Sequence, residues 1–331
     1  MAFIDTIKQK ARQDKKKIVL PEGMDVRIYE AADSVLKDEA ADVIILGTSE
    51  EVRQNSKGFD VSKATIIDPC KSDNLNSYVK QLYEIRKDKG MTEEEAYKLL
   101  TTDYMYFACM MLKNNEADGI VSGACHSTAN TIKPCLQIIK TKPGTKVVSA
   151  FFIMELPDKN FGADGVYIYG DSGLIQNPNP DELAEIAISS AESFRNLVGE
   201  EPYVAMLSHS TKGSAKHPDV DKVVTATSIV KEKCKDLNVD GELQFDSAII
   251  PEIGASKAPG SSVAGKANVL IFPDLDAGNI GYKLTERLAK ANAYGPLLQG
   301  IAKPANDLSR GCSAADIAGV IAITAVQAQE K

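Results

Sequence analysis

Short apolar runs alternate along the chain with longer stretches in which apolar residues recur every three or four positions. Runs rich in valine and isoleucine predict β-strands, and the longer periodic stretches predict amphipathic helices. We expect strands at 17–22, 42–48, 64–69, 118–124, 146–155, 203–210, 246–252 and 268–275. We expect helices at 25–38, 76–87, 92–114, 180–198, 218–237, 281–291 and 313–328. This alternation predicts βαβ units and an α/β fold whose largely parallel sheets are flanked by helices.

Several predicted helices begin with capping residues. Thr92 and Glu95 have the spacing of a capping box, and Asn179 precedes a proline at the first helical position, Pro180. The chain has 331 residues, which exceeds the usual size of one hydrophobic core. We therefore expect two domains.

Five of the predicted strands are followed, or bordered, by short segments of small polar residues. The endings read LPEG, SGACHSTANT, SHSTKGSAKHP, PEIGAS and FPDLDAGN. Ligands of open α/β sheets bind outside the carboxyl ends of the strands, so these endings predict a site in a cleft between the domains. Each loop taken alone is also explained by the ordinary need for polar turn residues.

Charge and composition narrow the function. The net charge is −8, so the surface as a whole should repel nucleic acid and anionic membranes, and an anionic substrate would need a local basic cluster. No secretory signal or membrane-spanning run is expected from the apolar pattern. Six isolated cysteines then indicate reduced thiols and a cytoplasmic protein, and only three histidines argue against a multi-histidine metal centre.

Two motifs suggest ligands but also have simpler explanations. GSSVAGKA at 260–267 nearly matches a nucleotide-binding P-loop, but it ends in alanine and precedes a strand instead of following one. No G-x-G-x-x-G follows a strand, so a dinucleotide site is unsupported. Asp274 and Asp276 could bind a divalent cation, although acids in a turn more often cap backbone N–H groups.

Two lysine-containing loops are candidates for anion binding. The segment 208–218 offers hydroxyls with Lys212 and Lys216, and it could equally be a solvated loop before a helix. In the segment 122–134 many donors surround Lys133, which the following Pro134 should hold in extended geometry.

The C-terminal segment contains a predicted helix whose start carries several reactive side chains. Ile317, Val320, Ile321 and Thr324 mark one face of a helix. The residues that precede this face combine hydroxyl, guanidinium, thiol and carboxyl groups within a few positions: Ser309, Arg310, Cys312, Ser313 and Asp316. Ser313 and Asp316 have the spacing of a capping box, so this segment is either an ordinary helix start or a catalytic site.

The sequence resembles the phosphate acetyltransferase (phosphotransacetylase) family almost from end to end. The stretches that carry the resemblance are LPEG (20–23), IRKDKGMT (85–92), SGACHSTANTIKPCLQIIKTKPG (122–144), IQNPNPDELAEIAI (175–188), MLSHSTKGSAKHPDVDKV (206–223), GELQFDSAIIPE (241–252), KAPGSSVAGKANVLIFPDLDAGNIGYKL (257–284) and KPANDLSRGCSAADIAGVIAITAVQAQ (303–329).

The resemblance implies reversible transfer of an acetyl group between coenzyme A and inorganic phosphate, by direct attack in a ternary complex. It implies an N-terminal α/β domain of residues 1–143 completed by 298–331, a second α/β domain of 144–297, and a homodimer. Coenzyme A would be a substrate, and no cofactor or metal would be needed. The partners expected are therefore small molecules, with neither nucleic acid nor membrane.

The resemblance also assigns site residues. Asp316 matches the proposed base, Ser309 and Arg310 match residues beside the reacting phosphate and carbonyl, and Arg86 matches an anion contact. From the matching stretches we also assign four substrate-binding residues: Ser127, Thr128, Lys133 and Lys283. The family usually has arginine where this chain has Lys133, which preserves the charge but not a bidentate phosphate contact. A nucleophilic Cys312 is the alternative to direct attack, because a thiol at a helix N-terminus tends toward thiolate.

Three other functions remain open at this stage. The first is the same reaction on a longer acyl group, such as butyryl. Each methylene changes the binding free energy in a pocket by only about 1–3 kcal/mol, and the sequence does not show the shape of the acyl pocket. A metal-dependent decarboxylating dehydrogenase could share such a two-domain scaffold, although no dinucleotide or metal motif supports it. A ligand-sensing domain without activity would have no need of a base at Asp316.

Overall fold

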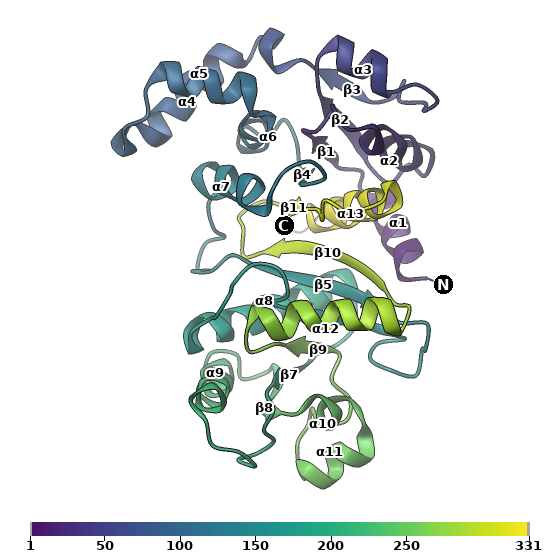
Figure 1. The fold of residues 1–331 in the computed structure, drawn as a ribbon, viewed down its shortest axis with the longest axis vertical. Helices are drawn as coiled ribbons and strands as arrows, with labels where there is room; N and C mark the ends of the chain where they lie inside the picture. Colours follow the sequence, from purple (N-terminus) through teal and green to yellow (C-terminus); the bar gives the residue numbers. More distant parts are fainter. Residues whose placement is uncertain (1, 330–331) are drawn as a thin grey trace. The chain divides into compact units, whose positions relative to one another are not determined.

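The computed structural model describes residues 2–329, and it divides into two compact units (Figure 1). The first unit comprises Met1–Pro143 together with Ile301–Lys331, and the second comprises Gly144–Gly300. The C-terminal segment therefore folds with the N-terminal half of the chain.

The first unit is built on a five-stranded, fully parallel sheet. Its strands in spatial order are β11 (Ala305–Asp307), β4 (Gly119–Ser122), β1 (Lys17–Leu20), β2 (Asp42–Leu46) and β3 (Thr65–Ile67). The three central strands are buried along almost their whole length, which explains their continuous valine and isoleucine runs.

Helices cover this sheet and extend beyond it. They are α1 (Phe3–Gln13), α2 (Val26–Lys37), α3 (Ser49–Asn55), α4 (Leu75–Arg86), α5 (Glu93–Thr102), α6 (Tyr104–Lys113), α7 (Thr128–Ile138) and α13 (Ala314–Gln327), with short 3₁₀ turns at Pro69–Lys71 and Lys87–Lys89. The helix α13 is apolar on nearly every side and packs against α1, α2 and β4. It is a core helix of the unit.

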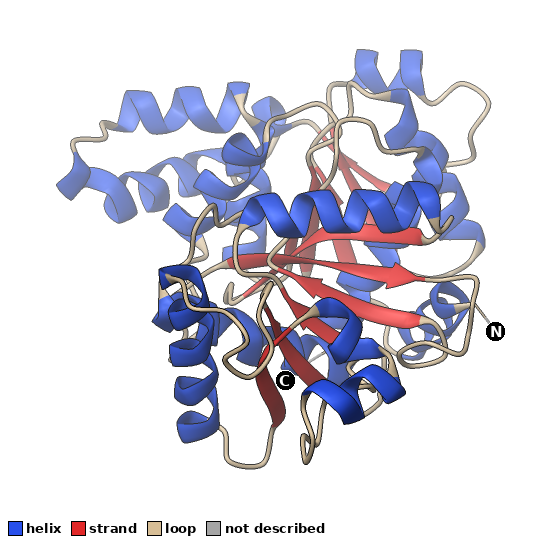
Figure 2. Cartoon of the chain, turned by 60° about the horizontal axis from the view of Figure 1, so that its bottom comes forward, coloured by secondary structure: helices blue, strands red, loops and turns tan. Residues whose placement is uncertain are grey.

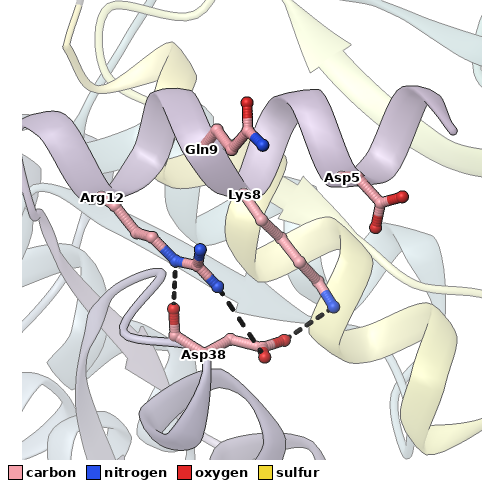
Figure 3. A pocket seen from close by; sticks show the side chains of 5 residues that line it. All are labelled: Asp5, Lys8, Gln9, Arg12 and Asp38. Carbon is pink, nitrogen blue, oxygen red and sulfur yellow. Dashed lines mark hydrogen bonds and ion pairs between the residues drawn. The ribbon is translucent and has the colours of Figure 1, made fainter. Parts of the chain in front are cut away.

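A small surface pocket marks the contact between α1 and the C-terminus of α2 (Figure 3). Lys8 pairs with the Asp38 carboxylate at 2.7 Å, and Arg12 Nε donates to the Asp38 carbonyl at 2.5 Å. Asp38 is the C-cap of α2, so these cations lie at the negative end of that helix. The contact anchors α1 to the unit, and the two cations Lys8 and Arg12 are both paired with Asp38.

The second unit contains a six-stranded mixed sheet. Its strands in spatial order are β10 (Asn292–Gln299), β5 (Ser149–Glu155), β6 (Val166–Gly170), β9 (Val269–Ile271), β7 (Tyr203–Leu207) and β8 (Asn238–Leu243). The strand β5 is antiparallel to both of its neighbours, and the remaining pairs are parallel. Its helices are α8 (Pro180–Leu197), α9 (Pro218–Lys233), α10 (Phe245–Ile249), α11 (Pro251–Lys257) and α12 (Leu275–Leu288) (Figure 2).

The α/β class with largely parallel sheets is confirmed, and seven of the eight expected strands are present. The strand expected at 246–252 is wrong, because α10 and α11 occupy it and Pro251 starts the second of these helices. The helix expected at 92–114 is two helices, because Asp103 ends one and caps the next. The helix expected from 281 begins at 275, after its cap Asp274.

The extended geometry expected for Lys133 is also wrong. Lys133 and Pro134 lie inside the helix α7, which begins at the N-cap Ser127. A proline disfavours helical geometry in the residue before it. Here the packing of α7 outweighs that preference, since Ile132, Pro134 and Cys135 are all buried. Being helical, Lys133 projects from the exposed face of α7.

A buried asparagine joins the returning C-terminal segment to the first unit. Asn306 on β11 is fully buried and donates to Thr324 Oγ1 at 2.8 Å and to Gln327 Oε1 at 2.7 Å, both on α13. We expect Asn306→Ala to lower the free energy of unfolding of the first unit by about 1–3 kcal/mol, because it removes two hydrogen bonds from a buried amide, one to the buried Thr324 and one to the half-buried Gln327.

Thermal or urea unfolding of the two proteins measures this difference. Asn76→Ala, on the exposed surface of α4, is the matched control and should change stability by less than about 0.5 kcal/mol. Equal stability of the Asn306 and Asn76 variants would show that the buried hydrogen bonds do not hold β11 to α13.

Candidate active site

Three loops begin side by side at the carboxyl edge of the first sheet (Figure 1). They follow β1, β4 and β11, which are neighbours in the sheet, and Asp307 on β11 is in register with Ser122 on β4. Because all three strands run parallel, their carboxyl ends share one edge. This edge gathers the segments 21–25, 123–127 and 308–313.

A buried carboxylate organises the middle loop. Glu22 is fully buried, and its Oε2 accepts hydrogen bonds from the backbone N–H groups of Gly123 and Ala124 at 3.0 and 2.9 Å. Its Oε1 accepts from the Cys125 N–H at 2.9 Å and contacts His126 Nδ1 at 2.7 Å. Three consecutive amides thus converge on one side chain, as in an anion-binding nest. The backbone of this loop is fixed by Glu22.

Gly123 allows the neighbouring loops to approach each other. Its φ is +114°, and a Cβ there would lie within 2.5 Å of the Leu308 nitrogen and would also collide with Asp307. Any larger residue would therefore push the loops after β4 and β11 apart.

Arg27 ties all three loops together. Its Nη1 donates to the carbonyls of Arg310 at 3.0 Å and Cys312 at 2.8 Å, and its Nη2 donates to the Ala124 carbonyl at 2.9 Å. The guanidinium is neutralised by Asp25, whose hydrogen bonds and charge raise the pKa of Arg27. The N–H groups of Arg27 are therefore committed to backbone carbonyls. The side chain of Arg310, in contrast, is exposed to solvent.

The start of α13 is a complete capping box. The Asp316 Oδ2 accepts from the Ser313 N–H and from the Ser313 hydroxyl, both at 2.8 Å, and the Asp316 N–H donates to Ser313 Oγ at 3.2 Å. Ser309, Arg310 and Asp316 are all exposed. Within residues 2–329, no acidic side chain pairs with the Arg310 guanidinium. The segment that leads into the positive end of α13 thus carries the exposed Arg310 guanidinium, and the first turn of the helix carries the Asp316 carboxylate.

The other assigned residues of this unit lie on α7 and α4. Ser127 is the N-cap of α7, where its side chain accepts from the Asn130 N–H, and Thr128 follows it. Lys133 is exposed on the same helix. Arg86 ends α4 and is half-buried, and its buried Nε has no hydrogen-bond partner in the described part of the chain.

The second unit holds Lys283 and the weaker motifs. Lys283 is exposed on α12 and donates to Asn279 at 2.7 Å. The Lys212 ammonium is bound by Asp240 at 2.6 Å, so it is not a free anion contact. Asp274 accepts from the Ala277 N–H as the cap of α12, and the segment 260–267 is a loop that leads into β9. These three motifs therefore have structural roles.

Desolvation and neighbouring carboxylates keep the thiols of the site neutral. Burial raises the pKa of Cys312 to about 11, and the Arg27 charge only partly offsets this effect. Burial, the hydrogen bond to Asp25 and the Glu22 charge raise the pKa of Cys125 to about 12. The thiolate tendency expected for Cys312 at a helix start is thus outweighed by desolvation.

Four further polar residues of this edge were not predicted from the sequence. Glu22 and Arg27 fix the loops, and His126 contacts Glu22. Asp307 is buried, and in the described part of the chain neither of its carboxylate oxygens has a well-formed hydrogen bond. Burial raises the pKa of Asp307. The polar ending LPEG was a usable signal for Glu22, whereas nothing local marks Arg27, because it lies in an ordinary amphipathic helix.

Residues 2–329 show neither a metal-binding cluster nor a membrane-spanning helix. No group of three or more histidine, cysteine, aspartate or glutamate side chains there is arranged to hold a metal ion. None of the helices in that range combines the length and apolarity needed to span a bilayer.

Comparison with known proteins identifies relatives of the whole chain. A model of the family described as phosphate acetyl/butaryl transferase matches residues 2–325. The phosphate acetyltransferases of Thermoanaerobacterium thermosaccharolyticum and Acetivibrio thermocellus are 56% and 55% identical, covering 99% of this chain and 100% and 99% of theirs. The crystal structure of a phosphotransacetylase from Streptococcus pyogenes has a TM-score of 0.92 and 46% identity over 99% of this chain and 98% of that one.

The pKa of Cys312 leads to a prediction about reactivity. With a pKa of about 11, the thiolate fraction near pH 7 is on the order of 10⁻⁴. We expect alkylation of Cys312 by iodoacetamide to be slow at pH 7 and to rise about tenfold per pH unit toward pH 10. Peptide mass spectrometry measures the rate, with Cys312→Ala as the blank. Rapid alkylation at pH 7 that levels off by pH 8 would contradict a raised pKa.

Proposed function

Because the chain belongs to the phosphate acetyl/butaryl transferase family, it transfers an acetyl group reversibly between coenzyme A and phosphate, and we propose that it does so by direct attack in a ternary complex at the carboxyl edge of the first sheet. The single observation that carries this proposal is the start of α13: Ser309 and Arg310 are exposed on a loop fixed by Arg27, and Asp316 is exposed in the first turn of the helix.

Arg310 is the proposed phosphate ligand. Its planar fork suits two phosphate oxygens, and no acidic partner within residues 2–329 occupies it. Arg27 is unsuited to this role because Asp25 and three backbone carbonyls already use its donors. The N-terminus of α13 adds backbone donors and a positive dipole end. Arg86, Lys133, Ser127, Thr128 and Lys283 are proposed as further substrate contacts.

Asp316 is the proposed base for the coenzyme A thiol. Its Oδ2 is occupied by Ser313, so the second oxygen is the one that would take a proton. A free thiol has a pKa of about 8.5 and a free aspartate about 3.9, a mismatch worth about 6 kcal/mol. Proton removal is therefore concerted with attack on the carbonyl, and no free thiolate forms beforehand. Ser309 donates to the oxygen that becomes negative in this step.

Direct attack is favoured over an acyl-enzyme. The only thiol at the start of α13, Cys312, is buried with its pKa raised to about 11, and its sulfur contacts Arg27. Such a thiol is a poor nucleophile near neutral pH. Acetyl transfer through Cys312 would first require its deprotonation in this buried position.

The proposal also covers the acyl group that is transferred, the oligomeric state and the cellular compartment. Acetyl is the proposed group, with butyryl as the alternative within the family. Coenzyme A acts as a substrate and no cofactor is needed. We expect a homodimer that works in the cytoplasm, and the cysteines are all unpaired, which suits a reducing compartment.

The activity is tested by coenzyme A-dependent formation of acetyl-CoA from acetyl phosphate, in EDTA and without a nicotinamide cofactor. We expect turnover with acetyl phosphate and less with butyryl phosphate. The reverse order would reassign the substrate, and failure with both would contradict the proposed function.

The role of Asp316 is tested by Asp316→Asn, which keeps the shape of the side chain and an oxygen that can cap α13. We expect kcat to fall about 10²–10⁴-fold, the usual worth of positioned proton transfer, with little change in KM or melting temperature. Steady-state kinetics and thermal unfolding measure the two effects.

The matched control is Glu95→Gln, which changes the same position of the capping box of α5. It should lower stability by no more than about 1 kcal/mol and leave kcat unchanged. If Asp316→Asn behaves like this control, Asp316 is only a helix cap and the thiol proton leaves by another route.

A further inference from the structure

His126 is held by a buried carboxylate in the loop that precedes α7. Its Nδ1 lies 2.7 Å from Glu22 Oε1, and Glu22 is fully buried, while the His126 side chain is one-third exposed. Because Glu22 accepts at this position, Nδ1 carries the proton of the hydrogen bond and Nε2 is left for another partner. Within residues 2–329, no hydrogen bond to Nε2 is found.

The loop that carries His126 lies next to the loop of the proposed phosphate site. The Ala124 carbonyl, two residues before His126, and the carbonyls of Arg310 and Cys312 are all bound by the single guanidinium of Arg27. The loop that carries His126 is therefore adjacent to the loop that carries Ser309 and Arg310.

The charged groups around His126 come from three elements. Glu22 contacts it directly from the loop after β1. Asp103, the cap of α6, interacts electrostatically with both His126 and Lys133 of α7. The two carboxylates attract an imidazolium and the lysine repels it. Asp103 thus links His126, which precedes α7, electrostatically with Lys133, which lies midway along it.

The reaction needs a proton at the phosphate. When a thiol attacks acetyl phosphate, the bond between the carbonyl carbon and a phosphate oxygen breaks, and a fully deprotonated phosphate is a strong base and a poor leaving group. The guanidinium of Arg310 cannot supply this proton, because arginine stays protonated in proteins. Asp316 receives a proton in the same step. A second group is required, with an affinity for protons near that of phosphate at neutral pH.

We propose that His126, oriented by Glu22, is the catalytic acid that protonates the leaving phosphate, and the base that deprotonates it in the reverse direction. This inference rests on the proposed function of the site. Imidazole is the side chain suited to both roles, because it can both give and take a proton near neutral pH.

The protons and bonds balance in this step. The thiol proton passes to the Asp316 carboxylate as the sulfur–carbon bond forms. The bond between the carbonyl carbon and the phosphate oxygen breaks, and that oxygen takes the Nε2 proton, which gives hydrogen phosphate and a neutral imidazole. Asp316 then loses its proton to solvent and His126 regains one. Glu22 is a positioning residue in this scheme, because it does not touch the substrate.

His126→Asn is the sharpest test, because the asparagine amide replaces the Nδ1–H donor to Glu22 and removes Nε2. We expect kcat to fall about 10²–10⁴-fold, with the KM for coenzyme A and the melting temperature little changed. In the wild type, kcat for acetyl-CoA formation should fall at high pH as the imidazolium is lost. In the direction of acetyl phosphate formation, kcat should instead rise with pH. Both dependences should be absent in His126→Asn.

Chemical rescue gives an independent readout. Added imidazole should restore a substantial part of the activity of His126→Ala, which a purely structural role would not allow. The matched control is His217→Asn, since His217 caps α9 through the same ring nitrogen and lies in the second unit. This control should keep normal kinetics and pH profiles.

The outcomes separate the two proposals. If the wild type makes no acetyl-CoA, the proposed function fails. If the wild type is active and His126→Asn keeps its kcat and both pH profiles, only the role of His126 is overturned. A lower melting temperature with imidazole-insensitive activity would make His126 a structural residue and would likewise overturn the inference.

Discussion

The candidate site depends on one buried carboxylate. Glu22 lies under the loop after β4 and accepts hydrogen bonds from three successive backbone amides, with a fourth contact to His126. A buried charge is costly unless it is fully hydrogen-bonded, and here the donors come from a loop that has no other internal structure. The same interaction therefore satisfies the charge and fixes the loop. An apolar residue at this position would leave three amides without acceptors.

Arg27 extends this order to the C-terminal segment. The site residues come from positions near 25, 125 and 310, which are far apart in the sequence, and β11 returns beside β4 to bring them together. Arg27 then fixes the backbone of the loops by binding three carbonyls, while Asp25 compensates its charge. One arginine is thus committed to structure, and Arg310 stays free to meet a substrate anion.

Helix caps and buried strands were predictable from the sequence, and contacts between segments that are far apart in the chain were not. The capping box of Ser313 and Asp316 follows from a spacing of three residues, and the buried strands follow from their apolar runs. The short strand β11 has no such run, and its place beside β4 is set by the burial of Asn306 against α13. Lys133 is helical because its neighbours pack into the core, which overrides the preference set by Pro134. The links made by Glu22 and Arg27 span about 100 and 285 positions, so no local pattern could reveal them.

Amide hydrogen exchange at Gly123, Ala124 and Cys125 tests most directly whether Glu22 orders the site. The comparison is between the wild type and Glu22→Gln, which keeps the size of the side chain but turns one acceptor into a donor. We expect exchange at these three amides to accelerate strongly, while the amides of β1 and β4 keep their protection. Unchanged exchange at the three amides would contradict the central role of Glu22.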